Sequence, residues 1–134
     1  MRNRFNSILI VLLVMLVNTT IVKGADMKDI QTLSLIEVIA NAQEYDGKAI
    51  RVVGFLNLEF ESKALYLSRD DAQHSVTKNA LWVELEKWTE YKKFNKHYVL
   101  IEGVFDANNK GHLQLYSGSL THIKRLILWG ESTK

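Results

Sequence analysis

Three side chains that could support acid–base or metal chemistry lie in one short polar stretch: Asp70, Asp71 and His74. The carboxylates stand four and three residues before the imidazole, a spacing at which one helical turn could aim all three at a common point. A divalent metal or an acid–base pair would use such an arrangement. The other histidines lie on separate segments, and a pattern of this kind is more often a polar loop. A small metal-assisted hydrolase using these three residues is therefore the alternative function.

A second carboxylate pair, Glu59 and Glu61, lies two residues apart in an alternating segment, so both side chains face the same side of the expected strand. Glycoside hydrolysis needs two carboxylates, but it also needs a deep cleft that raises the pKa of one of them. A domain of this size rarely holds such a cleft. The sequence also has no nucleophile elbow, phosphate-binding loop or dinucleotide fingerprint. These observations favour a non-catalytic protein without a cofactor.

Four aromatic side chains are expected on strand faces that look away from the core: Phe55, Tyr66, Trp82 and Tyr116. Rings on such a face can form a stacking platform for bases or sugars, and each stacked base contributes roughly 1–3 kcal/mol. The alternative is that the rings pack against one another across strands or lie beneath the N-terminal helix, which is the commoner arrangement for any single ring.

The predicted ligand contacts combine three of these rings with three charged side chains that would orient a polar guest. They are Tyr66, Trp82, Tyr116, Arg51, Glu59 and Glu84. Carboxylates beside the platform would repel a phosphate backbone, so a sugar, a peptide or a protein fits better than nucleic acid. A further possibility is that the aromatic face is an interface between copies of the chain.

The N-terminus has the layout of a signal peptide. Arg2 and Arg4 precede an unbroken apolar run over residues 8–17, and we expect cleavage after Gly24. The apolar run is about half of the 20 residues that a spanning helix needs, although retention as an uncleaved anchor is the alternative. The mature chain, residues 25–134, is then periplasmic or secreted, with no transmembrane span after leader removal.

The leader also accounts for the basic balance of the sequence. Of 17 Lys and Arg residues it holds Arg2, Arg4 and Lys23, which leaves 14 against 15 Asp and Glu residues. The mature chain is therefore nearly neutral and lacks the positive charge with which nucleic-acid binders hold phosphates. Because the sequence contains no cysteine, an exported domain must rely on its hydrophobic core alone.

Hydrophobic periodicity predicts one helix, five strands and a short helical segment. A capping box formed by Ser34 and Glu37 starts a helix of about ten residues, and Gly54 lies inside a long first strand. Residues 69–79 have no period and are expected to form a loop with at most one helical turn. Trp88, Tyr91 and Phe94 recur every three residues and predict a short helix. The strands are expected over residues 49–60, 64–68, 80–85, 97–105 and 112–117, with a bent extension over 120–128.

This order of elements, with a glycine in the long first strand and a helix between the third and fourth strands, is that of the five-stranded Greek-key barrel called the OB-fold. The segments that carry the likeness are turn and core positions at 34–37, 45–48, 52–55, 65–67, 81–83 and 99–103. Over residues 33–127 the chain resembles the small exported bacterial OB-fold proteins. The resemblance implies the fold and a binding role, but no particular ligand.

Together these observations predict a mainly β domain over residues 25–134, an OB-type barrel with an N-terminal helix. We expect it to act as a non-catalytic binding or interaction module of the bacterial cell envelope. Its predicted partner is a small polar ligand or an envelope protein.

Overall fold

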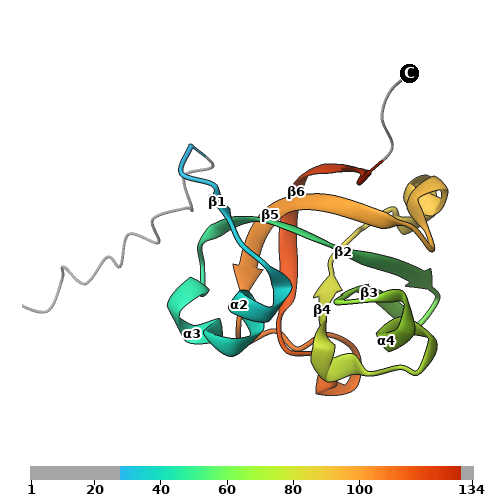
Figure 1. Ribbon diagram of the computed structural model, residues 1–134, viewed down its shortest axis with the longest axis horizontal. Coiled ribbons are helices and arrows are strands. Elements are labelled where there is room, and N and C mark those ends of the chain that lie inside the picture. Colours follow the sequence, from blue (N-terminus) through green and yellow to red (C-terminus); the bar gives the residue numbers. More distant parts are fainter. Residues whose placement is uncertain (1–27, 131–134) are drawn as a thin grey trace, which may run out of the picture.

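The sheet of this protein has six strands and closes on itself (Figure 1). The computed structural model describes residues 28–130, so the predicted leader at residues 1–24 lies outside the described residues. The sheet order is β1-β2-β3-β4-β6-β5, and β5 pairs in turn with β2, which completes a closed ring of strands. The strands are β1 (Gln31–Thr32), β2 (Ala49–Glu59), β3 (Ser62–Tyr66), β4 (Ala80–Val83), β5 (Tyr98–Asp106) and β6 (Ser119–Leu128).

Strand β1 is absent from the prediction, which had five strands. It pairs in parallel with the start of β2, with Gln31 opposite Ile50 and Thr32 opposite Arg51. An element of two residues is too short to show an alternating pattern. β1 lies outside the ring and extends the sheet beyond β2.

The strand predicted over residues 112–117 is wrong. Its residues form a loop that contains the short 3-10 element η3 (His112–Gln114), in which Leu113 and Gln114 have φ angles of +53° and +59°. Two consecutive residues in the left-handed region turn the backbone away from the extended path that a strand needs. The strand that completes the ring is β6, which coincides with the segment expected only as a bent extension.

The predicted helix begins where expected and is then divided. The Ser34 hydroxyl accepts a hydrogen bond from the Glu37 amide at 3.1 Å, which caps the first turn. Asn41, with φ −124° and ψ 40°, separates α2 (Leu35–Ala40) from α3 (Ala42–Tyr45). The helical segment therefore has about the predicted length, but it consists of two short helices.

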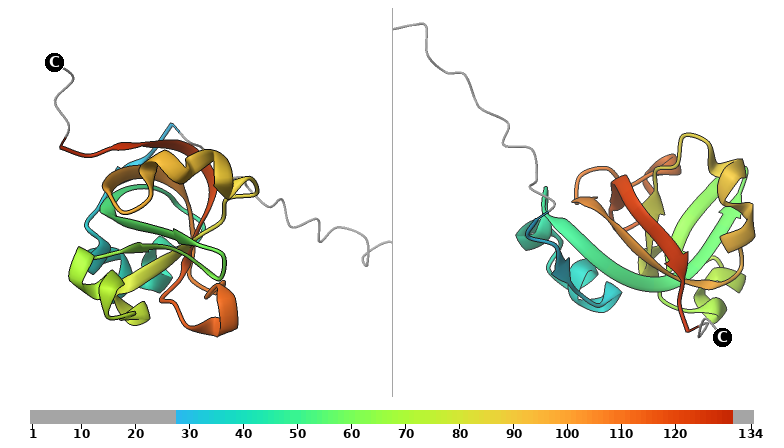
Figure 2. Two further views of the ribbon diagram at one scale, coloured as in Figure 1. Left: turned by 90° about the vertical axis from the view of Figure 1, so that its right-hand side faces the viewer. Right: turned by 90° about the horizontal axis from the view of Figure 1, so that it is seen from above.

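The connections between strands carry further short helices. The segment predicted as a loop contains α4 (Arg69–Gln73) and the 3-10 helix η1 (Thr77–Asn79). The 3-10 helix η2 (Trp88–Phe94) lies between β4 and β5, on the opposite side of the ring from α2 and α3 (Figure 2). None of the helices within residues 28–130 is long and apolar enough to cross a membrane.

The main hydrophobic core lies inside the ring and confirms the predicted alternation. Ile50, Val52, Leu56 and Leu58 of β2 are all buried in it, as are the apolar residues at alternate positions of β3, β4 and β5. The three rings of η2 pack partly buried against this core. A 3-10 helix has three residues per turn, so every third residue lies on the same side, which explains the period seen in the sequence.

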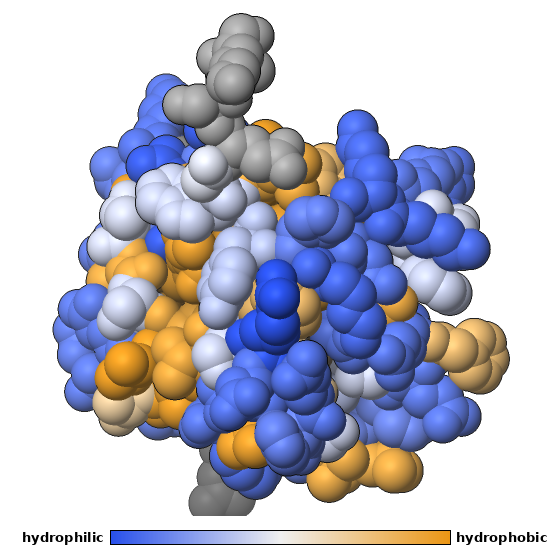
Figure 3. Space-filling model, turned by 45° about the vertical axis from the view of Figure 1, so that its right-hand side comes forward, coloured by the Kyte–Doolittle hydropathy of each residue, from blue (hydrophilic) through white to orange (hydrophobic). Residues whose placement is uncertain are grey.

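Some large apolar side chains stay exposed and interrupt a largely hydrophilic surface, as one face of the molecule shows (Figure 3). The most exposed are Phe60, at the end of β2, and Leu113, in η3, at 80% and 73%. Single apolar residues on a surface are normal and do not by themselves mark a binding site.

Gly54 sits where β2 changes its hydrogen-bonded partner. Residues 49–55 of β2 pair with β5, and residues 55–59 pair with β3. A Cβ at Gly54 would come within 2.7 Å of both the Tyr66 carbonyl oxygen and Leu65 Cγ. The absence of a side chain therefore allows β3 to approach β2 at this point.

We expect Gly54→Ala to lower the free energy of unfolding by about 1–3 kcal/mol, because the new methyl group has no space. Gly47→Asn is the matched control, since Gly47 has a φ of +73° and open space around it, and Asn tolerates the left-handed region. The control should change stability by only a few tenths of a kcal/mol. Urea denaturation of both variants measures this, and equal losses would contradict the packing role of Gly54.

Candidate functional site

The outer face of β3 and β4 carries a second, smaller hydrophobic cluster. Tyr66 and Tyr116 are its largest fully buried members, at 2% and 3% exposure, and they pack with Ala64, Ala80 and, from α4, Ala72. These rings lie outside the main core, but the prediction that they are displayed to a ligand is wrong. They pack against their neighbours instead, which is the alternative considered from the sequence.

Phe55 is likewise buried rather than displayed. It is 2% exposed and meets Tyr98 edge to face, with ring centroids 5.4 Å apart. Three of the four predicted rings, Phe55, Tyr66 and Tyr116, are therefore buried. Their apolar contacts hold α4 and the loop before β6 against the sheet.

Of the four aromatic side chains predicted to face outward, Trp82 is the one that is partly exposed to solvent. Its indole packs against Tyr116 at a centroid distance of 5.4 Å, and the Lys63 ammonium lies 5.3 Å from its centroid. Gly111 is so close that a Cβ there would come within 2.5 Å of Trp82 Cγ. The indole is therefore fixed by contacts with the ring of Tyr116 and the backbone of the loop.

A cleft of about 760 Å³ opens beside Trp82, where β4 and β6 separate. The two strands pair in parallel only through Trp82 with Ser119 and Val83 with Leu120. Beyond this point β4 leads toward η2 while β6 pairs with β5. The volume is in the range of small-molecule sites. The lining includes Lys63, Trp82, Glu84, Glu90, Tyr91 and His122.

His122 reaches the cleft from an irregularity in β6. Glu102 pairs with Arg125 and Val104 with Thr121, so three residues of β6 face Gly103 alone. Within this bulge His122 has a φ of +48°, a conformation that costs a residue other than glycine of order 1–3 kcal/mol. Its Nδ1 lies 3.0 Å from the Thr121 hydroxyl, which orients the ring. Bulges of this kind often redirect a side chain beside a binding site.

The charges around the cleft are mixed. Lys63 and Lys87 face three carboxylates, those of Glu84, Glu86 and Glu90. Lys87 and Glu90 lie 3.9 Å apart, and Glu84 accepts a hydrogen bond from the Asn109 side chain at 3.2 Å. With one more carboxylate than ammonium group and a histidine, the cleft favours neither a strongly anionic nor a strongly cationic guest.

Two of the predicted contact residues lie elsewhere. Arg51 is bound to the nearly buried Glu102 at 2.7 Å, and Arg125 reaches the same carboxylate at 3.4 Å. Glu59 is paired with Lys96 at 2.9 Å. The structure therefore brings Trp82 and Glu84 together in the cleft and places Arg51 and Glu59 in separate ion pairs.

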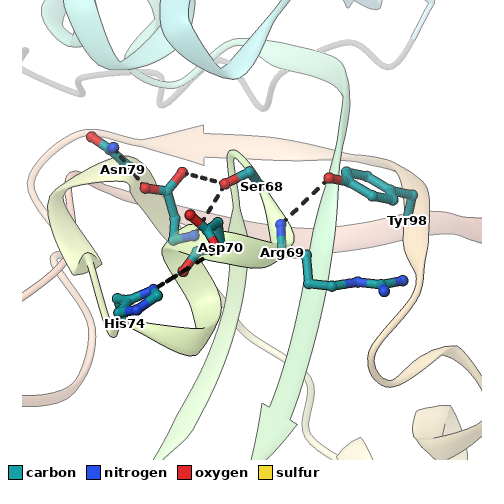
Figure 4. Close-up of polar contacts among 7 residues, drawn as sticks. Ser68, Arg69, Asp70, His74, Asn79 and Tyr98 are labelled. Carbon is teal, nitrogen blue, oxygen red and sulfur yellow. Dashed lines mark hydrogen bonds and ion pairs between the residues drawn. The ribbon is translucent and has the colours of Figure 1, made fainter.

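The residues of the alternative function, Asp70, Asp71 and His74, do not converge (Figure 4). The Asp71 carboxylate accepts hydrogen bonds from Ser68 at 2.8 Å and from Asn79 at 3.1 Å. The Ser68 hydroxyl in turn caps α4 by accepting from the Asp71 amide. His74 Nδ1 lies 3.0 Å from the carbonyl oxygen of Asp70 and 4.0 Å from its carboxylate. Within the described residues no group of three metal-ligating side chains stands together.

The cleft also includes Lys63, Tyr91 and His122, which the sequence analysis did not select. Tyr91 enters the sequence analysis only as one of three periodic rings, and Lys63 falls between two of the predicted strands. The signal for His122 is weak, because a histidine in an otherwise regular strand pattern gives no indication of a left-handed backbone.

Comparison of the sequence with models of known protein families and with curated proteins finds no match. The functional argument therefore rests on the geometry of the cleft.

We expect His122→Gly to leave the free energy of unfolding unchanged or to raise it by up to about 1 kcal/mol, because glycine adopts a positive φ without strain. His122→Val should lower it by about 1–2 kcal/mol, since a β-branched residue tolerates this conformation worst. His112→Gly, at an exposed histidine without a positive φ, is the matched control and should be mildly destabilising. Chemical denaturation measures the free energy of unfolding of each variant. If His122→Gly loses as much stability as His122→Val, the backbone at His122 is not strained.

Burial raises the pKa of the Tyr116 phenol above its ordinary value, and Tyr66 and Glu59 add to this, while the contact with Ser62 lowers it. Because the pKa of Tyr116 is higher in the folded than in the unfolded state, folding favours the neutral phenol. This contribution to stability is fully present below the pKa of an unfolded tyrosine, about 10, and is lost as the pH rises from there through the pKa of the folded state. We therefore expect the free energy of unfolding to fall as the pH rises above about 10. Tyr116→Phe should weaken the dependence without abolishing it, since burial raises the pKa of Tyr45 as well. Thermal melts across alkaline pH measure this, and an unchanged profile in Tyr116→Phe would contradict it.

Proposed function

We propose that the protein is an exported binding module of the bacterial cell envelope, built as an OB-type barrel, with its ligand site in the cleft beside Trp82. The strand order supports the fold: β2 pairs with both β3 and β5, β4 pairs in parallel with β6, and η2 stands between β4 and β5. The leader-like N-terminal sequence supports export.

The observation that carries the proposal is that a fixed indole and a strained histidine line the same cleft. Trp82 is held by Tyr116 and by the backbone at Gly111. His122 lines the same cleft in a costly backbone conformation, with a φ of +48°. Such strain persists where the surrounding structure fixes it, and it occurs preferentially at functional sites.

The chemistry of the lining favours a neutral polar guest, and among these a saccharide. Trp82 and Tyr91 both line the cleft, and their rings supply apolar surface for the apolar face of a sugar. The carboxylates of Glu84, Glu86 and Glu90 can accept hydrogen bonds from hydroxyl groups. A phosphate chain would meet more carboxylates than ammonium groups.

Binding fits the cleft better than catalysis does. Its charged side chains, including Glu84, Glu86 and Lys87, are exposed at the rim, so water has access to a bound guest. Hydrolases instead exclude bulk water around a carboxyl group whose pKa is raised.

The test uses the three indole N–H signals of the protein, from Trp82, Trp88 and Trp129. We expect neutral trisaccharides such as cellotriose or triacetylchitotriose to shift the Trp82 signal saturably in a ¹⁵N NMR titration. Trp82→Phe should remove that signal and thereby assign it, and Trp82→Ala should weaken binding about tenfold or more, since a stacked ring contributes about 1–3 kcal/mol. Trp129→Phe is the matched control, because Trp129 is 55% exposed and lies outside the cleft.

Shifts caused by triglycine but not by the saccharides would replace the sugar with a peptide as the ligand. If neither moves the Trp82 signal, the cleft is not a site for neutral guests and the proposal fails.

A further inference from the structure

A second pocket, of about 400 Å³, lies between β2, α4 and the residues just before β5. It is lined by Phe55, Arg69, Ala72, Gln73 and Lys96, and we call it the Phe55 pocket. It shares no lining residue with the Trp82 cleft. We propose that the Phe55 pocket binds a small organic carboxylate, held by the Arg69 guanidinium and the Lys96 ammonium group.

Arg69 is held in place before any ligand arrives. Its guanidinium carbon lies 5.5 Å from the centre of the Phe55 ring, and its backbone amide donates a hydrogen bond to the Tyr98 hydroxyl at 3.4 Å. Phe55 is in turn buried and fixed by Tyr98. A guanidinium that lies over a ring has lost part of its freedom, while its N–H groups stay available for a carboxylate.

The Arg69 charge has no acidic partner in the part of the chain that the structure describes. Within residues 28–130 the ion pairs involve other basic side chains. The carboxylate of the neighbouring Asp70 lies toward His74, whereas the Arg69 side chain extends beneath Tyr98 (Figure 4). The guanidinium therefore remains available to an anion.

Lys96 supplies the second positive charge from a strained position. Its φ is +62°, and the backbone there is held by hydrogen bonds from Lys96 N to Leu56 O at 2.8 Å and from Leu56 N to His97 O at 2.9 Å. Its ammonium group donates to the Asn57 side chain and to Glu59. An ammonium group has three N–H donors, so one remains for a ligand.

The charge and shape of the pocket select the ligand class. The lining of the pocket holds two cationic side chains, Arg69 and Lys96, and no carboxylate. A guanidinium edge matches the two oxygens of a carboxylate, and the apolar lining by Phe55 and Ala72 suits the ring of an aromatic ligand. Gln73 offers an amide to a further polar group. A small aromatic carboxylate satisfies all of these features.

Benzoate is the probe, in NMR titrations that follow the amides of Phe55, Arg69 and Gln73. We expect saturable shifts with benzoate and none with benzamide, which has the same shape without the charge. Arg69→Gln should weaken benzoate binding about ten- to hundredfold, as the loss of a charge-assisted bidentate contact does, and Arg69→Lys should restore it only in part. Arg125→Gln, at a half-exposed arginine outside the pocket, is the matched control and should bind like the unaltered protein.

A thermal melt of each variant verifies folding, and Arg69 is exposed, so its replacement should leave the melt unchanged. Equal binding of benzamide, or unaltered binding in Arg69→Gln, would overturn the proposal. If inorganic phosphate displaces benzoate completely at equal concentration, the pocket is a phosphate site and not a carboxylate site. The signals followed here are distinct from the Trp82 indole, so this proposal and the one for the cleft can fail separately.

Discussion

The structure depends on one strand, β2, that hydrogen-bonds to two different neighbours. Its first seven residues pair with β5 and its last five with β3, and Phe55 is the residue that pairs with both. The switch requires the backbones to come close at Gly54, where a side chain would meet β3 and also Leu35 of α2. The same glycine therefore permits ring closure and the seating of the N-terminal helix.

Closure of the ring creates both candidate sites. Because β4 and β6 share only two residue pairs, the ring is weakly joined there, and the Trp82 cleft occupies the space where the strands part. At the switch in β2, Phe55 is turned outward and covered by Tyr98 and Arg69. The Phe55 pocket thus lies at the point where β2 changes partner, and the Trp82 cleft where β4 and β6 diverge.

The sequence predicted the elements that have a clear period or a local signal. The alternation around Ile50 and Leu56 located β2, the Ser34 hydroxyl located α2, and the three-residue spacing of Trp88 and Tyr91 located η2. Periodicity also placed Phe55, Tyr66 and Trp82 on the outer face of their strands, whereas Tyr116 lies in the loop before β6. It could not tell that Tyr66 and Tyr116 are covered, since the cover comes from segments distant in the sequence.

The remaining misses have a backbone origin. The stretch His-Leu-Gln-Leu-Tyr at 112–116 alternates like a strand, yet Leu113 is left-handed and points its apolar side chain into solvent. His122 is left-handed within a strand that otherwise alternates. Histidine is enriched several-fold among non-glycine residues with a positive φ, but this preference does not single out His122 among the four histidines, so the feature that most clearly marks the cleft is seen only in three dimensions.

The small outer cluster, in which Tyr66 and Tyr116 are buried, lies between the two sites. Trp82 of the cleft and Ala72 of the Phe55 pocket both pack against it. Tyr116 packs against Trp82 through its ring, and its hydroxyl lies 3.2 Å from the Ser62 hydroxyl. The Asn57 side chain donates to Ser62 at 3.4 Å and accepts from Lys96 of the Phe55 pocket. A continuous chain of contacts thus runs from the indole of one site to the ammonium group of the other. Groups held in this way lose little freedom when a ligand arrives, which lowers the entropic cost of binding. The buried tyrosines therefore hold in place the exposed side chains from which the two proposed sites are built.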